Sequence, residues 1–162
     1  MNNSQTNELK RILKLKVIVH NWAQFRYGVF SESPHKTPEN NEEFYFNSKG
    51  ELEASRCSLE LTGYLRNPTA SSEKCEDFQS NGLPGINCIF EDDIKPQDSN
   101  SRIGSLMYRP FLTQLNEFCD NNETSPKTLH NKFAPNAQNK ECNGKSVWEV
   151  GFLKNSNNNN NI

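Results

Sequence analysis

Hydrophobic residues recur along the first part of the chain at the three- and four-residue steps of an α-helix, from Leu9 to about Arg26. Thr6 or Asn7 is placed to cap the start of this helix. The three β-branched residues at 17–19 would suit a strand equally well. Because apolar side chains lie on most sides of the cylinder, the pattern predicts a buried helix.

A second helical pattern covers residues 101–119, where seven apolar side chains recur at the same steps. Pro110 lies inside this segment and predicts a kink. Between the two helices, alternating apolar residues from Phe44 to Ala54 flank a polar loop and predict a β-hairpin. Gly50 at the end of that loop suits a positive φ.

The other segments are predicted to be less regular. Residues 57–98 contain several turn residues and too few aliphatic side chains for a core of their own, so disulfides must tie them to the surface. A polar, Asn-rich loop follows at 130–142, and a short apolar element closes the chain at 146–150. We expect an α+β protein with three parts: a disordered start at 1–6, a partial domain at 7–154 and an Asn-rich disordered tail at 155–162.

Composition narrows the class of protein. The 162 residues suit one domain, and a net charge of −2 gives no sign of nucleic acid or an anionic membrane as a partner. Five cysteines without a C-x-x-C pair indicate disulfides of an oxidising compartment rather than a zinc ribbon. The odd count leaves at least one without an intrachain partner, and the pairing stays open among Cys57, Cys75, Cys88, Cys119 and Cys142.

The start of the chain shows no export signal. It is polar, and no apolar run approaches the about 20 residues of a membrane span. The simplest reconciliation with secreted-type cysteines is a sequence that is incomplete at its start. Asn122 begins an N-glycosylation sequon, Asn-Glu-Thr, which has meaning only in an exported protein. A second match begins at Asn2.

Candidate chemistry is concentrated in residues 19–32, which read V-H-N-W-A-Q-F-R-Y-G-V-F-S-E. The active-site helix of a zinc protease carries two His at i and i+4, with a Glu after the first as general base. A Gly then turns the chain back, and a third ligand lies just beyond the turn. His20 and Gly28 occupy the first and the turn positions of this pattern.

The other reacting positions are substituted. The base position holds Asn21, which has no ionisable group. The second His position holds Gln24 and the third-ligand position holds Ser31, and both are poor ligands for zinc. One good ligand does not hold zinc. On spacing alone, His20 is more simply an ordinary core or surface histidine.

Four sequence blocks in order carry a resemblance to a known family: H-N-W-A-Q-F-R-Y-G-V-F at 20–30, F-Y-F-N-S-K-G-E-L-E-A-S-R-C-S at 44–58, S-L-M-Y at 105–108 with E-F-C at 117–119, and H-N-K-F-A-P-N-A-Q-N-K-E-C-N-G-K-S-V-W-E-V at 130–150. The sequence resembles the N-terminal domain of the calcium-activated chloride channel regulator family, whose first block reads H-E-W-A-H-L-R-W-G-V-F. The likeness spans about residues 9–150.

In that family the first block belongs to a zincin-like metalloprotease implicated in self-cleavage. By position, His20 matches the first zinc His, Asn21 the catalytic Glu, Gln24 the second zinc His and Ser31 the Asp that is the third ligand. The resemblance therefore implies a fragment of a zincin-like metalloprotease fold with a disulfide-tied irregular segment. The residues around the reacting positions match the family, whereas the ligands and the general base do not, as in a pseudo-enzyme. We therefore expect neither catalysis nor bound zinc or another cofactor.

The resemblance also implies a function and a place. We expect a non-catalytic, protease-like domain, extracellular or at the cell surface, that modulates chloride conductance indirectly by binding an extracellular or membrane protein such as a chloride channel. Cys57, Cys119 and Cys142 lie at positions that match the family, and Cys75 and Cys88 match less closely.

Two alternatives stay open. The chain could be a residual zinc metallopeptidase in which His20 recruits Glu32, His35 or His130 as new ligands. It could also be a truncated gene product without stable function, because members of the family carry an export signal and strands before this helix, and a von Willebrand factor type A domain after it.

Overall fold

The computed structural model of the chain describes residues 3–37, 41–93, 104–112 and 115–153. Its four strands follow one another along the chain and form two small antiparallel sheets, with helices before and after them, which is consistent with the α+β class. The elements are α1 (Asn3–Tyr27), β1 (Phe44–Phe46), β2 (Leu52–Ala54), β3 (Gly63–Arg66), β4 (Ile89–Asp92), η1 (Pro126–Thr128), α2 (Ala137–Glu141) and η2 (Glu149–Leu153).

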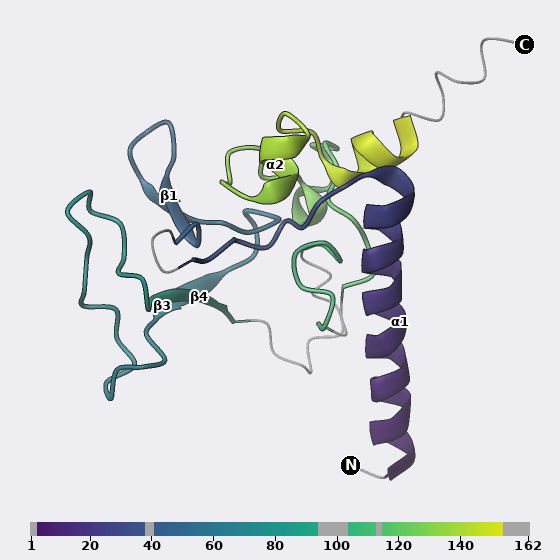
Figure 1. Ribbon diagram of the computed structural model, residues 1–162, viewed down its shortest axis with the longest axis horizontal. Helices are drawn as coiled ribbons and strands as arrows, with labels where there is room; N and C mark the ends of the chain where they lie inside the picture. Colours follow the sequence, from purple (N-terminus) through teal and green to yellow (C-terminus); the bar gives the residue numbers. More distant parts are fainter. Residues whose placement is uncertain (1–2, 38–40, 94–103, 113–114, 154–162) are drawn as a thin grey trace, which may run out of the picture.

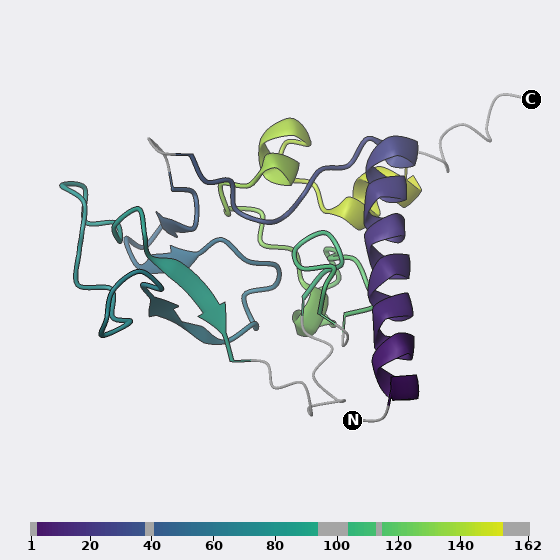
Figure 2. The ribbon, with the colours of Figure 1, turned by 60° about the horizontal axis from the view of Figure 1, so that its bottom comes forward.

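The other elements lie on one side of a single long helix. α1 stands along one edge of the molecule, and the two hairpins lie on the opposite side (Figure 1). α2 lies between them, and the π-helical turn η2 packs against the C-terminal end of α1. The same arrangement is seen in Figure 2, where α1 again forms the outer edge.

The predicted hairpin is confirmed. β1 pairs antiparallel with β2, with Phe44 opposite Ala54 and Phe46 opposite Leu52. The side-chain oxygen of Asn47 accepts hydrogen bonds from the backbone of the connecting loop, and Gly50 has φ +77° as expected.

Residues 57–98 are more regular than predicted in their described part. β3 and β4 form a second antiparallel ladder, joined by a long excursion that the Cys75–Cys88 disulfide ties back. Gly63 lies against the Phe90 ring and the Glu91 carbonyl, so closely that a Cβ would come within 2.3 Å of that oxygen. The hydrophobic pattern missed this ladder because its strands are short and one of them is largely exposed.

Two clusters of buried side chains form the core. The first contains one aromatic residue from each hairpin, Phe44 and Phe90, and three of the disulfide cysteines. Its members are Phe44, Ala54, Cys57, Leu61, Cys88, Phe90, Tyr108 and Cys119. The second joins the end of α1 to the closing segment: Ala23, Val29, Met107, Val147 and Val150. The predicted apolar element at 146–150 therefore does close the core.

The first predicted helix is confirmed, but its predicted burial is wrong. α1 already begins at Asn3, so residues 3–6 are helical rather than disordered and neither Thr6 nor Asn7 is its cap. Only one side of α1 packs on the body. There the buried Lys16 Nζ donates to the carbonyls of Leu112 (3.0 Å) and Leu115 (2.6 Å). Seven of the large apolar residues of α1 are exposed: Ile12, Leu15, Val17, Ile18, Val19, Trp22 and Phe25.

The second predicted helix is wrong in its described part. Residues 104–112 form turns and a loop, and residues 115–119 have no regular structure. Residues 101–103 and 113–114 lie outside the described residues, as does the predicted tail at 155–162. The apolar side chains do not share one face: Tyr108 joins the first cluster and Met107 the second, while Phe111 is exposed. Pro110 interrupts the backbone pattern, and Lys16 takes two of the carbonyls.

The two disulfides should differ in what they contribute to stability. Cys57–Cys119 closes a separation of 62 residues and Cys75–Cys88 one of 13. Loop-closure entropy then predicts a loss of about 4 kcal/mol for Cys57→Ala/Cys119→Ala and about 3 kcal/mol for Cys75→Ala/Cys88→Ala. Urea unfolding of both double variants beside the oxidised parent measures the difference. Equal losses, or the reverse order, would contradict the entropic explanation.

Candidate functional site

The turn that ends α1 has the geometry expected of the motif. Gly28 has φ +65°, and its N–H donates to the carbonyl of Gln24 at 3.0 Å. A residue with a side chain is strained at such a φ, so glycine permits the helix to end in this way. The chain then passes through the buried Val29 into the body of the protein.

Two of the side chains at the motif positions make hydrogen bonds within the protein. His20 Nδ1 lies 3.2 Å from Asn21 Oδ1, and Asn21 itself is exposed. Ser31 Oγ donates to the carbonyl of Met107 at 3.2 Å, so it is turned to the backbone. Within the described ranges, no cluster of three metal-ligating side chains includes His20. A tetrahedral zinc site needs several His, Cys or carboxylate ligands, which these residues do not supply.

The residue after Ser31 is the centre of a different arrangement. The carboxylate of Glu32 is fully buried, and its Oε1 lies 3.2 Å from Nδ1 of the equally buried His130. His130 Nε2 lies 2.7 Å from Asn139 Oδ1. The structure thus brings together two of the residues proposed as new ligands, but not with His20, and His35 is exposed.

Asn139 holds the His130 ring in place. The Asn139 side-chain nitrogen donates to the carbonyls of Asn131 and Ala134, both at 2.8 Å, so its oxygen faces the ring and accepts from Nε2. On the other side of the ring, Nδ1 lies against Glu32 Oε1. Both ring nitrogens therefore have a hydrogen-bond partner, which makes the complete burial of the ring tolerable.

A cluster of three candidate metal ligands does surround Glu32. Its carboxylate oxygen and the sulfurs of Cys57 and Cys119 all lie within 4.8 Å of one another. The two cysteines are joined in a disulfide, whereas zinc binds cysteine as the thiolate. With the bridge intact, the cluster offers a metal one carboxylate only. The second oxygen of Glu32 has no hydrogen-bond partner among the described residues.

Residues 130–142, predicted as a loop, fold into a buried polar network that contains the short helix α2. Asn136 caps α2 by accepting from the N–H of Asn139 at 2.9 Å. Gln138 is fully buried, accepts from the N–H of Phe30 at 2.7 Å and donates from its backbone to the Ser31 carbonyl at 3.2 Å. The sequence analysis missed this helix because it is short and polar. The signal that could have revealed it was the close spacing of asparagine and glutamine residues at 136–139.

Asn131 extends this network to the first hairpin. Its oxygen accepts from the Tyr45 hydroxyl, and its nitrogen donates to the Arg56 carbonyl, both at 3.1 Å. Burial is the main reason that the pKa of Tyr45 lies above its usual value. Burial likewise raises the pKa of Tyr108, in the first core cluster, to about 12. These groups therefore hold the fold together and are not poised for proton transfer near neutral pH.

The remaining sequence-based candidates are accounted for as follows. Four cysteines form the disulfides Cys57–Cys119 and Cys75–Cys88, and Cys142 lies outside both bridges, against the second core cluster. Asn122 is exposed, and its side-chain oxygen accepts from both the N–H (3.0 Å) and the hydroxyl (2.7 Å) of Thr124.

The buried pair should respond to substitution as a unit. His130→Ala leaves the Glu32 carboxyl group buried without its partner, and we expect a loss of about 3–5 kcal/mol in the free energy of unfolding. Glu32→Gln keeps a donor for Nδ1 without a charge and should cost at most about 1–2 kcal/mol. The double variant should then be more stable than His130→Ala alone. Denaturant unfolding tests this order, and Glu32→Gln losing as much as His130→Ala would refute it.

Comparison with known proteins shows where the chain belongs. A family model described as "Calcium-activated chloride channel N terminal" matches residues 5–162. Calcium-activated chloride channel regulator 1 of Mus musculus is 34% identical over 141 residues, 83% of this chain. Regulator 2 of Mus musculus is 34% identical over 142 residues, and regulator 1 of Homo sapiens 32% over 140. No solved structure matches the chain.

The matched region is a small part of these relatives. It covers 14% of the length of the mouse regulator 1 and 13% of the mouse regulator 2. The match nevertheless extends over nearly the whole of this chain, from α1 through the hairpins to the polar network. The chain belongs to the calcium-activated chloride channel regulator family, and corresponds to its N-terminal region.

Proposed function

We propose that this chain is a non-catalytic, protease-like module that acts by binding, and that it contributes to the regulation of calcium-activated chloride conductance without forming a pore itself. The observation that carries the proposal is which residues occupy the four reacting positions and what they contact. His20 alone is a good zinc ligand, Asn21 is an exposed amide, and Ser31 donates to a backbone carbonyl.

The region around these positions supports the same proposal. Gly28 keeps the turn, and Glu32 Oε1 lies 3.2 Å from Nδ1 of the buried His130. Metal-assisted hydrolysis needs both a metal and a general base. A domain that keeps its backbone shape but lacks the general base can still bind a partner through its surface. The chloride channel regulators among the relatives suggest an extracellular or membrane protein as that partner.

One structural observation bears on the relation to the membrane. None of the helices in the described part of the chain is both long enough and apolar enough to cross a lipid bilayer.

Zinc content tests the loss of the active site directly. We expect the oxidised parent to hold no stoichiometric zinc, and His20→Ala to behave like it. The matched variant Asn21→Glu/Gln24→His/Ser31→Asp restores the missing groups and should bind about one zinc per chain. Metal analysis after dialysis gives the readout. Zinc in the parent that His20→Ala removes would overturn the proposal and favour the residual metallopeptidase.

Glycosylation tests whether Asn122 is an acceptor site once the chain is exported, as an extracellular location would require. Asn122 is exposed, and it accepts a hydrogen bond from the hydroxyl of Thr124, the threonine of the same sequon. The chain offers an internal control, because Asn67 makes the same two bonds with Thr69 but is followed by a proline. After expression behind an added export leader, we expect a glycosidase-sensitive shift that Asn122→Gln reduces by one step and Asn67→Gln leaves unchanged. An unmodified Asn122 would contradict the expectation.

A further inference from the structure

The cluster of Glu32, Cys57 and Cys119 has a different chemistry before its disulfide forms. Every cysteine is made as a thiol, and two sulfurs become linked only when an oxidant takes up two electrons. Until then the cluster consists of one carboxylate and two thiols, and its ligand atoms lie within 4.8 Å of one another in the structure. Thiolates and carboxylates both bind zinc. The reduced chain therefore has the set of ligands that the oxidised chain lacks.

The two carboxylate oxygens of Glu32 differ in their surroundings. The side chain is fully buried, and Oε1 lies 3.2 Å from Nδ1 of His130. Nε2 of the same ring lies 2.7 Å from the Asn139 side chain, so the carboxylate is held from one side. Oε2 is also buried but has no hydrogen-bond partner among the described residues. Carboxylates that bind a metal are commonly hydrogen-bonded through the rest of the group, as Glu32 is here.

Both cysteines are held in place by more than the bridge between them. The Arg56 carbonyl, next to Cys57, accepts from the Asn131 side chain at 3.1 Å. The Cys119 carbonyl accepts from the N–H of Trp148 at 3.4 Å. Both cysteine side chains are buried in the first core cluster. None of these contacts depends on the disulfide, so we expect the two thiols of the reduced chain to stay beside the carboxylate.

A zinc ion fits between the three groups. Bonds of about 2.3 Å to sulfur and about 2.0 Å to oxygen place the ligand atoms of a tetrahedral site about 3.3–3.8 Å apart. The Cα atoms of Cys57 and Cys119 are 6.5 Å apart. Rotation about the Cα–Cβ bonds therefore separates the two sulfurs to the required distance without moving the backbone. The chain supplies three ligands in this way, and a water molecule completes the tetrahedron.

We propose that the reduced chain binds one Zn²⁺ through Glu32 Oε2 and the thiolates of Cys57 and Cys119, and that formation of the disulfide expels the metal. On binding, the two thiols release two protons to the solvent. On oxidation by a small-molecule disulfide, one thiolate attacks the oxidant, and the second thiolate then attacks the mixed disulfide. The oxidant leaves as two thiolates that take up protons from water. The protein keeps the new disulfide, and Zn²⁺ returns to solution.

Bound zinc would favour the native pairing of the cysteines. A chain with five thiols can form wrong pairs, and a metal that holds Cys57 and Cys119 together leaves the other three outside the site. An extracellular protein passes through this reduced state before its disulfides form, so the site agrees with the proposed location. It also does not depend on the loss of the motif site, which concerns His20 and the oxidised chain.

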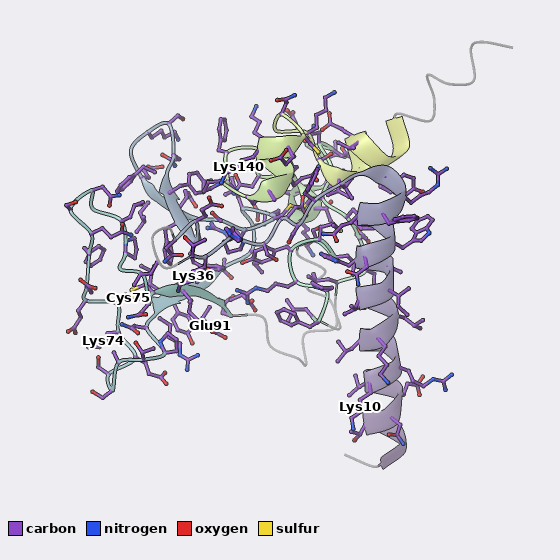
Figure 3. The ribbon with its side chains drawn as sticks, viewed as in Figure 1. Lys10, Lys36, Lys74, Cys75, Glu91 and Lys140 are labelled. Carbon is purple, nitrogen blue, oxygen red and sulfur yellow. A yellow bond between two sulfur atoms is a disulfide. The ribbon has the colours of Figure 1, made fainter. Side chains whose placement is uncertain are left out.

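The second disulfide provides a matched control in the same chain. Cys75 lies in the excursion between β3 and β4, on the side of the molecule away from α1 (Figure 3). Within the described ranges, no carboxylate or histidine completes a set of three ligands with Cys75 and Cys88. Reduction of this bridge yields two thiols but no site of this kind. Comparison of the two bridges therefore separates the proposed site from the general affinity of thiols for zinc.

Metal analysis of the full chain, refolded with zinc and a phosphine reductant and then dialysed, tests the proposal. We expect about one zinc per reduced chain and none in the oxidised chain. Co²⁺ in place of zinc should show the charge-transfer absorption of thiolate ligands. Oxidised glutathione should then release the zinc as the Cys57–Cys119 bridge forms, which peptide mapping detects. A reduced chain that holds no more zinc than the oxidised chain would overturn the proposal.

Substitution of the proposed ligands ties the zinc to this cluster. Cys119→Ser should weaken zinc binding by the reduced chain about a hundredfold or more, and Glu32→Gln about tenfold or more. Glu32→Gln is the sharper test, because it keeps a partner for His130 Nδ1 and costs little stability. If Glu32→Gln binds zinc as tightly as the parent, the carboxylate is not a ligand and the assignment is wrong.

Three control variants should leave zinc binding by the reduced chain unchanged: Cys75→Ser/Cys88→Ser, Cys142→Ser and His20→Ala. The last separates this cluster from the motif on α1. Zinc that a control variant loses and Cys119→Ser retains would refute the assignment. In the unsubstituted reduced chain, zinc should slow alkylation of Cys57 and Cys119 by iodoacetamide about tenfold or more, and a chelator should reverse this. That measurement tests the ligands without relying on the folding of a variant, and equal alkylation with and without zinc would contradict the proposal.

Discussion

The buried contact between Glu32 and His130 joins parts of the chain that are 98 residues apart, and the rest of the described fold is arranged around it. The Cys57–Cys119 disulfide lies beside Glu32, and Gln138 holds the segment that follows α1. The strands are only three or four residues long, so backbone ladders contribute few hydrogen bonds. Buried side-chain hydrogen bonds therefore connect segments that a larger sheet would otherwise hold together.

This arrangement explains how the turn keeps its shape although residues at the reacting positions are substituted. Gly28 and Glu32 determine the course of the backbone, the first through its positive φ and the second through its buried partner. The position of Asn21 is exposed, where substitution has little effect on stability. A fold built in this way tolerates changes at the reacting positions, and selection for binding can then act on other surfaces.

α1 has two faces with different roles. His20 lies toward the inner side, near Lys16, which anchors the helix through the carbonyls of Leu112 and Leu115. Large apolar residues are exposed on the other sides of the helix, among them Ile18, Trp22 and Phe25. The proposed loss of catalysis concerns the inner face alone.

The sequence by itself determined the features that depend on neighbours along the chain. These are the helix up to about Arg26, the hairpin whose loop ends at Gly50, the turn at Gly28 and the family. Only the tertiary structure decided which side of α1 is covered, why residues 104–112 are not helical, which cysteines pair and that Glu32 meets His130. Apolar periodicity counts positions, but it does not say which side receives a partner. That depends on atoms such as Lys16 Nζ and the Leu112 carbonyl, which lie 96 residues apart and meet only in the folded chain.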